Sequence, residues 1–138
     1  MAFDQTLTTS FKQDILLGVH DLETDTIKMA LFLATADLGA ATTVYTTTGE
    51  TSGTGYTAGG YVMTGVTVLT ADTTAYVDFA DTVWNPASFT ARGALIYNAS
   101  KSNKAIAVLD FGSDKTTTTS FTVQMPANTA TSALIRIS

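Results

Sequence analysis

Hydrophobic and polar residues alternate along most of this chain, and the alternation predicts strands. The clearest case is residues 89–112, where two runs that lean apolar, 94–97 and 105–111, flank a polar segment at 98–104. Half-buried strands around a turn of Asn, Ser and Lys predict a β-hairpin. The second run is nearly all Ala, Ile, Val, Leu and Phe. We therefore expect it to be buried on both faces, in the middle of a sheet.

Other stretches repeat this pattern. Residues 26–36 predict a strand, and residues 61–70 and 73–80 predict a second hairpin. Residues 121–125 and 133–137 predict two more strands near the end of the chain. The side chains expected to face inward are Ile27, Met29, Leu31, Leu33, Val62, Val66, Val68, Ala75, Val77, Phe79, Phe121, Val123, Met125, Ile135 and Ile137.

One stretch has the spacing of a helix. Residues 1–9 are small and polar and indicate an N-terminal arm. Ser10 and Gln13 have the spacing of a capping box, which predicts a helix from residue 10 or 11 to about residue 21. Its apolar stripe consists of Phe11, Ile15, Val19 and Leu22. We expect this stripe to pack on the core of the protein, with binding to a partner protein as the less favoured alternative.

These elements define a fold class. Seven or eight strands, one short N-terminal helix and no β-α-β spacing favour an all-β fold. We expect an antiparallel β-sandwich, or a barrel-like variant of it, formed by residues 10–138 as a single domain.

Composition narrows the function classes. Only 14% of the 138 residues are charged, against about 25% in typical proteins, and 28 are threonine. Such a chain either buries much of its surface in an assembly, or has a surface made polar by threonine hydroxyl groups.

The net charge of −5 argues against binding to nucleic acid and against a polybasic membrane anchor. No segment is long and apolar enough to cross a membrane, and cysteine is absent. The start lacks the pattern of a secretory signal, so synthesis in a cytoplasm is expected.

Interface candidates come from unusual positions. Trp84 is the only tryptophan; we expect it to cover one end of the core, with an exposed interface anchor as the alternative. Residues 49–60 hold five glycines and form either an exposed connection or a functional loop. Tyr56 in that loop and Tyr61 just after it are further candidates. Arg92 lies in an apolar neighbourhood and needs an acid or carbonyl partner. That partner is Asp78, Asp81 or Asp110 within the fold, or a group of a neighbouring subunit.

Candidate chemistry is sparse. The single histidine, His20, has no nucleophile motif beside it and indicates a helix cap or a surface residue. The aspartates near strand ends lack the spacing of a calcium loop. Asn98-Ala99-Ser100 matches a glycosylation sequon but indicates a turn. We therefore expect no enzyme activity, no cofactor and no metal. The aspartates considered for calcium are Asp72, Asp78, Asp81, Asp110 and Asp114.

Three segments carry a resemblance to a known family. They are TSFKQDILLGVHDLETDTIKMALF, YTTTGETSGTGYTAGG and FTARGALIYNASKSNKAIAVLDFG, and the resemblance spans roughly residues 10–137. Together they resemble small proteins encoded by tailed phages, which are uncharacterised or described as virion structural proteins. The most specific parts are residues 53–60 and 91–97.

The resemblance implies a component of a virus particle, with no catalytic residues to carry over. Within it we expect a capsid decoration or cement protein that binds the major capsid protein or other virion proteins. A symmetric homo-oligomer, most naturally a trimer, would suit that role, and residues 1–9 could become ordered on the shell. Its location would be the virion, assembled in the cytoplasm of a bacterial host. The alternatives are a tail, neck or fibre-associated protein, and a glycan-binding module in which Tyr56, Tyr61 or Trp84 forms an exposed aromatic platform.

Overall fold

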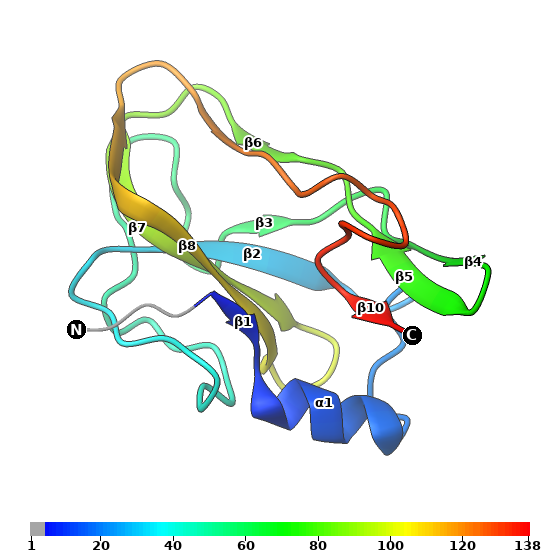
Figure 1. Cartoon of the computed structure of the whole chain (residues 1–138). Helices are drawn as coiled ribbons and strands as arrows, with labels where there is room; N and C mark the ends of the chain where they lie inside the picture. The colour runs from blue at the N-terminus through cyan, green and yellow to red at the C-terminus, as the bar shows by residue number, and fades with distance from the viewer. Residues whose placement is uncertain (1–4) are drawn as a thin grey trace.

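The computed structural model describes residues 5–138 and shows a mostly β, sandwich-like fold with one short helix (Figure 1). The predicted fold class is therefore confirmed. Its antiparallel sheets have five, three and two strands. The elements are β1 (Thr6–Leu7), α1 (Thr9–Leu16), β2 (Ile27–Phe32), β3 (Tyr61–Val62), β4 (Thr67–Ala71), β5 (Thr74–Asp78), β6 (Thr82–Trp84), β7 (Phe89–Asn98), β8 (Lys104–Thr117), β9 (Phe121–Val123) and β10 (Arg136–Ile137).

The largest sheet is organised around the predicted hairpin of β7 and β8. Its strand order is β1-β8-β7-β2-β3, so both hairpin strands are interior, as expected. The hairpin is longer than predicted, because the polar residues 113–116 continue β8. There the hydroxyls of Thr90 and Thr116 are 2.8 Å apart across the two strands. Threonine is β-branched, so this polar segment extends the strand instead of ending it.

Strand β2 is buried on both faces. Met29 packs into the larger core cluster, whereas Phe32 packs on the opposite face with Leu95 and Val108. This explains why its sequence is almost continuously apolar. The predicted strand at 26–36 is correct in position but ends at Phe32.

The three-stranded sheet has the order β10-β5-β4. Strands β4 and β5 form the second predicted hairpin, which turns at Asp72 with a φ of +53°. Val68 was expected to face inward, but it is 46% exposed because β4 is an edge strand. For the same reason Val62 in β3 is 54% exposed. Ile137 in the short strand β10 is 57% exposed, also against expectation.

The helix begins and ends earlier than predicted. Its N-cap is Thr8, whose hydroxyl accepts from the Phe11 N–H at 3.2 Å, so the proposed capping box at Ser10 is wrong. The helix ends at Leu16 because Gly18 adopts a φ of +72°, and the Val19 N–H then donates back to the Asp14 carbonyl at 2.9 Å. This is the geometry of a glycine-terminated helix end.

Residues 6–9 are part of the folded structure, although the sequence placed them in an arm. Thr6 and Leu7 pair with Val108 and Ala107 of β8, and Thr8 is fully buried. The first four residues of the predicted arm lie outside the described residues. No helix between residues 5 and 138 is long and apolar enough to span a membrane.

The two-stranded sheet contains one strand that the alternation did not predict. Residues 82–84 form β6 and pair with β9, which brings Trp84 opposite Phe121. By contrast, the threonine-rich segment at 42–47 is not a strand. It contributes one isolated bridge, between Val44 and Lys104.

Candidate functional site

Arg92 is held within the fold. Its Nε donates to Asp110 Oδ1 at 3.1 Å, so Asp110 is its partner among the aspartates considered. The pKa of Asp110 is lowered, first by the Gly112 N–H that donates to it and then by Arg92. The Arg92 side chain remains 30% exposed. The ion pair fixes the outer rim of β7 against β8 and leaves part of the guanidinium at the surface.

Trp84 lies in the core, with none of its surface exposed. Its ring is stacked on Tyr61, with centroids 5.2 Å apart and planes 16° from parallel, and it meets Phe89 and Phe121 edge-on. A covered ring cannot touch a partner, so Trp84 is not an interface residue. Tyr61, 41% exposed, is the outermost ring of this cluster and remains an interface candidate.

The expected aromatic platform for a glycan is not formed. Trp84 is covered, and Tyr56 points its hydroxyl inward, where it accepts from the Leu31 N–H at 2.9 Å and donates to Glu50. Tyr61 alone among the three presents a ring to solvent. The arrangement gives no flat pair of rings against which a sugar could stack.

Glu50 organises the glycine-rich segment. Its carboxylate accepts from the Tyr45 hydroxyl at 2.7 Å, from the Tyr56 hydroxyl and from the Gly59 N–H at 2.8 Å. Tyr97 donates to the Gly59 carbonyl at 2.6 Å and stacks on Tyr45. Burial, reinforced by Glu50, raises the pKa of both Tyr45 and Tyr56, and that of Tyr97 to about 12. All three phenols therefore stay protonated at neutral pH and act as hydrogen-bond donors.

The same segment packs closely on β2. A Cβ built on Gly60 would lie 1.8 Å from the Met29 carbonyl oxygen, and one on Gly55 would lie 2.0 Å from that of Pro86. The tip of the segment is exposed, as expected of a connection, whereas Thr51 and Gly59 are buried. The single charge and the glycines of this segment thus serve to dock it on the sheet.

His20 is neither a cap nor a surface residue. Its side chain is fully covered, its Nδ1 lies 3.0 Å from the Asn98 Nδ2, and its Nε2 lies 3.9 Å from Asp14 Oδ2. The Asn98 amide also donates to Asp25 at 2.8 Å, and Asp25 holds Lys101 at 2.8 Å. Burial lowers the pKa of His20, so the ring is neutral at pH 7.

This network joins three segments that are distant in the sequence. Because Asn98 Nδ2 is a donor, His20 Nδ1 acts as acceptor and the ring proton sits on Nε2, which has no hydrogen-bond partner among the described residues. Sequence reasoning did not find Asp25 or Asn98. The available signal was a polar residue, Asn98, directly after a run of buried apolar ones. Its burial also removes it as a glycosylation site.

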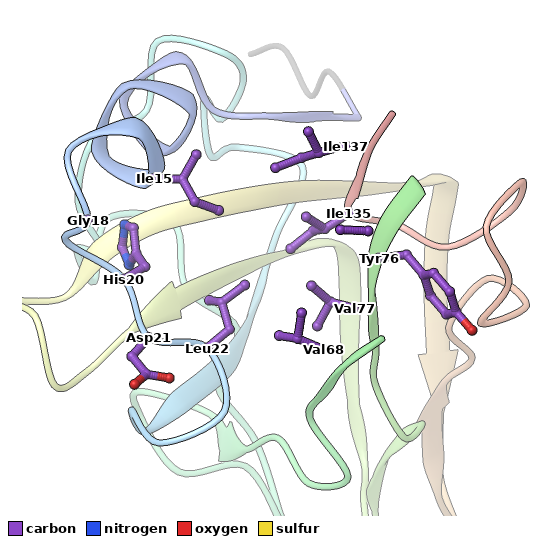
Figure 2. Close-up of a pocket in the computed structure, with 11 residues that line it drawn as sticks. Ile15, Gly18, His20, Asp21, Leu22, Val68, Tyr76, Val77, Ile135 and Ile137 are labelled. Carbon is purple, nitrogen blue, oxygen red and sulfur yellow. The ribbon is translucent and has the colours of Figure 1, made fainter. Parts of the chain in front are cut away.

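An apolar pocket of about 400 Å³ lies between α1 and the three-stranded sheet (Figure 2). Ile15 and Leu22 line it from the side of the helix, and Val77 and Ile135 from the sheet. Its rim is exposed at Ile137. The side chains of Leu16 and Leu17, next to Ile15 in the chain, are 87% and 69% exposed. Large apolar side chains therefore line this pocket, and two more are exposed at the end of α1.

Residues 5–138 contain no group of three or more His, Cys, Asp or Glu side chains placed to hold a metal ion. Comparisons with known protein families, with curated proteins and with solved structures find no match for this chain.

Proposed function

We propose that this protein is a non-enzymatic structural component of a tailed-phage virion, and that it decorates or cements the outside of the assembled capsid. Its partner is then the major capsid protein or a neighbouring virion protein. The resemblance of residues 10–137 to small phage virion proteins supports this role.

The observation that carries the proposal is the exposure of large apolar side chains at the end of α1 and in β10. Leu16, Leu17 and Ile137 are each more than half exposed on a chain in which only 14% of residues are charged. Exposed apolar patches of this kind mark surfaces that associate with other proteins. Binding to the shell would cover these side chains, which the mostly β fold holds in place.

The test is the copy number of the protein in purified virions, measured by quantitative mass spectrometry against the major capsid protein. Hundreds of copies in simple ratio to the capsid protein are expected. Six, twelve or a few dozen copies would instead assign the protein to the neck, tail or fibres. Absence from the particle would contradict the virion role altogether.

A matched pair of variants tests the surface. Leu16→Ser combined with Leu17→Ser removes the two most exposed leucines, and we expect it to lower the copy number while the isolated protein stays folded. Val83→Ser changes a 47% exposed residue of β6 and should leave incorporation unchanged. Equal incorporation of both variants would show that the helix end does not contact the shell.

A further inference from the structure

We propose that the free edge of β4 pairs with β4 of a second copy of this chain, antiparallel across a two-fold axis. The inference is independent of the proposed function. Strand β4 is at the end of its sheet and at the periphery of the molecule (Figure 1), and four of its five residues are exposed. A strand edge of this kind presents peptide groups that can pair with another strand.

Two observations fix which peptide groups point outward. Val68 faces Val77 in β5, and the Val77 N–H donates to the Ile135 carbonyl at 3.1 Å, on the side away from β4. The Val68 N–H correspondingly donates away from β5, to Glu23 Oε2 at 2.8 Å. Because the direction alternates along a strand, the peptide groups of Val68 and Thr70 face outward and those of Leu69 face β5.

These outward groups are self-complementary. With Leu69 opposite Leu69 of the second copy, Val68 lies opposite Thr70 of that copy, and Thr70 opposite its Val68. Each such pair exchanges two backbone hydrogen bonds, which satisfies every outward group of both strands. An isologous two-fold contact requires this match of a surface with itself.

Side chains support the same register. The sequence of β4 is TVLTA, so the strand itself brings no charged residue to the contact although each chain carries a net charge of −5. Leu69, 38% exposed, would pack on its symmetry mate at the centre of the contact. Val68, 46% exposed, would be covered on the other face by Thr70 of the second copy.

Glu23 regulates access to the edge. In the monomer its carboxylate accepts a hydrogen bond from the Val68 N–H. A strand that pairs with this edge must displace the carboxylate. Charged side chains and segments that cover an edge strand limit its pairing with other strands. We therefore expect association of the wild-type chain to be weak and to strengthen when this acceptor is removed.

The experiment measures the oligomeric state by sedimentation equilibrium over a concentration series, with amide hydrogen exchange at Val68 and Thr70. The wild type should form a concentration-dependent dimer that protects both amides. Glu23→Ala should dimerise about a hundredfold more tightly, because each of the two copies no longer has to break one hydrogen bond to a charged group, worth about tenfold. Leu69→Lys should be monomeric, because it places like charges opposite each other at the axis.

Two controls separate the edge from other effects. Val83→Lys adds the same charge at an exposed residue of β6 and should leave the dimer intact. An equal mixture of Leu69→Lys and Leu69→Glu chains should dimerise again, which a misfolded variant could not do. A wild type and a Glu23→Ala variant that both stay monomeric, or a dimer that survives Leu69→Lys, would overturn the proposal. Protection of Val68 that appears only when purified virions are added would assign the edge to another protein and would also overturn it.

Discussion

At the scale of single residues, the polar groups within this fold are placed so that they hold segments together. His20 shows this most clearly, since its ring is covered and bonded to the Asn98 amide through Nδ1. If Nδ1 were protonated, its N–H and the N–H of the Asn98 amide would be two donors facing each other. The charged groups around the ring are mixed: Asp14 and Asp25 favour the protonated form, whereas Lys101 and Lys104 oppose it, and burial outweighs all of them.

The stability of the protein should therefore depend on pH through His20. The pKa of His20 in the folded state lies below its ordinary value of 6.5, so the unfolded chain takes up a proton first as the pH falls. The free energy of unfolding should decrease from about pH 6.5 down to the folded pKa, by at most about 1.4 kcal/mol per pH unit. Urea unfolding at pH 7.5 and pH 5 measures this difference.

A matched variant assigns the effect to the histidine. His20→Gln retains an acceptor for Asn98 but cannot titrate, so its stability should change less between the two pH values. Asp25, with a pKa lowered to about 2, loses its stabilising contribution only as the pH falls below its ordinary value of 3.8, outside this window. An NMR titration that gives the folded His20 a pKa of 6.5 or above would contradict the prediction.

At the scale of elements, sequence pattern predicted what depends on local chemistry. The alternation at 89–112 predicted the central hairpin, and the helix was predicted in the right place but about five residues too long at its C-terminal end. The position of each strand within the sheets could not be predicted, because it depends on contacts between segments that are distant in the sequence. Val68 and Ile137 have strand-like neighbours, and their exposure follows from where their strands lie in the sheets.

Among the candidate residues, the need of Arg92 for a partner could be predicted from the sequence, but the role of Glu50 could not. Arg92 was expected to need an acid or carbonyl partner, and it pairs with Asp110. The role of Glu50, however, depends on Tyr45 and Tyr97, which reach it only after the chain has folded back over β2. A lone acid in a glycine-rich segment gives no sign of that. The helix was likewise expected to continue to about residue 21, although Gly18 terminates it.

The docking of the glycine-rich segment on β2 predicts a large difference between two glycines that both have positive φ. Gly60→Ala would place a methyl group 1.8 Å from the Met29 carbonyl oxygen, whereas a Cβ on Gly112 meets nothing within 4 Å. Because φ is +79° and +83° at the two positions, backbone strain is common to both. We expect Gly112→Ala to destabilise the fold by about 1–2 kcal/mol and Gly60→Ala by clearly more. Chemical denaturation of both variants measures the difference, and equal losses would contradict close docking.

At the scale of the whole molecule, one cluster joins all three sheets. Trp84 from the two-stranded sheet, Val77 from the three-stranded sheet and Phe89 and Leu31 from the five-stranded sheet belong to the same buried core. A shared core means that no sheet can lose its packing alone. Two-state behaviour is the usual consequence in chains of this size.

Unfolding should accordingly follow a single transition. Trp84 fluorescence reports the two-stranded sheet and far-UV circular dichroism reports all strands, and the two denaturation curves should coincide. Trp84→Ala should lower the free energy of unfolding by about 3–5 kcal/mol. Val83→Ala, at an exposed neighbour, should change it by less than about 0.5 kcal/mol. Separate midpoints for the two signals in the wild type would show that the sheets unfold independently.

The pairing of β2 with β7 also bears on how the chain is made. Ile27 pairs with Asn98, and Thr6 of β1 pairs with Val108, so strands synthesised early wait for partners synthesised late. At about 5–20 residues per second, a nascent β2 spends several seconds outside the ribosome with both apolar faces uncovered. Translation speed through residues 33–88 thus sets the length of an aggregation-prone interval. Slower codons in that region should raise the insoluble fraction of the newly made protein without changing the stability of the finished one.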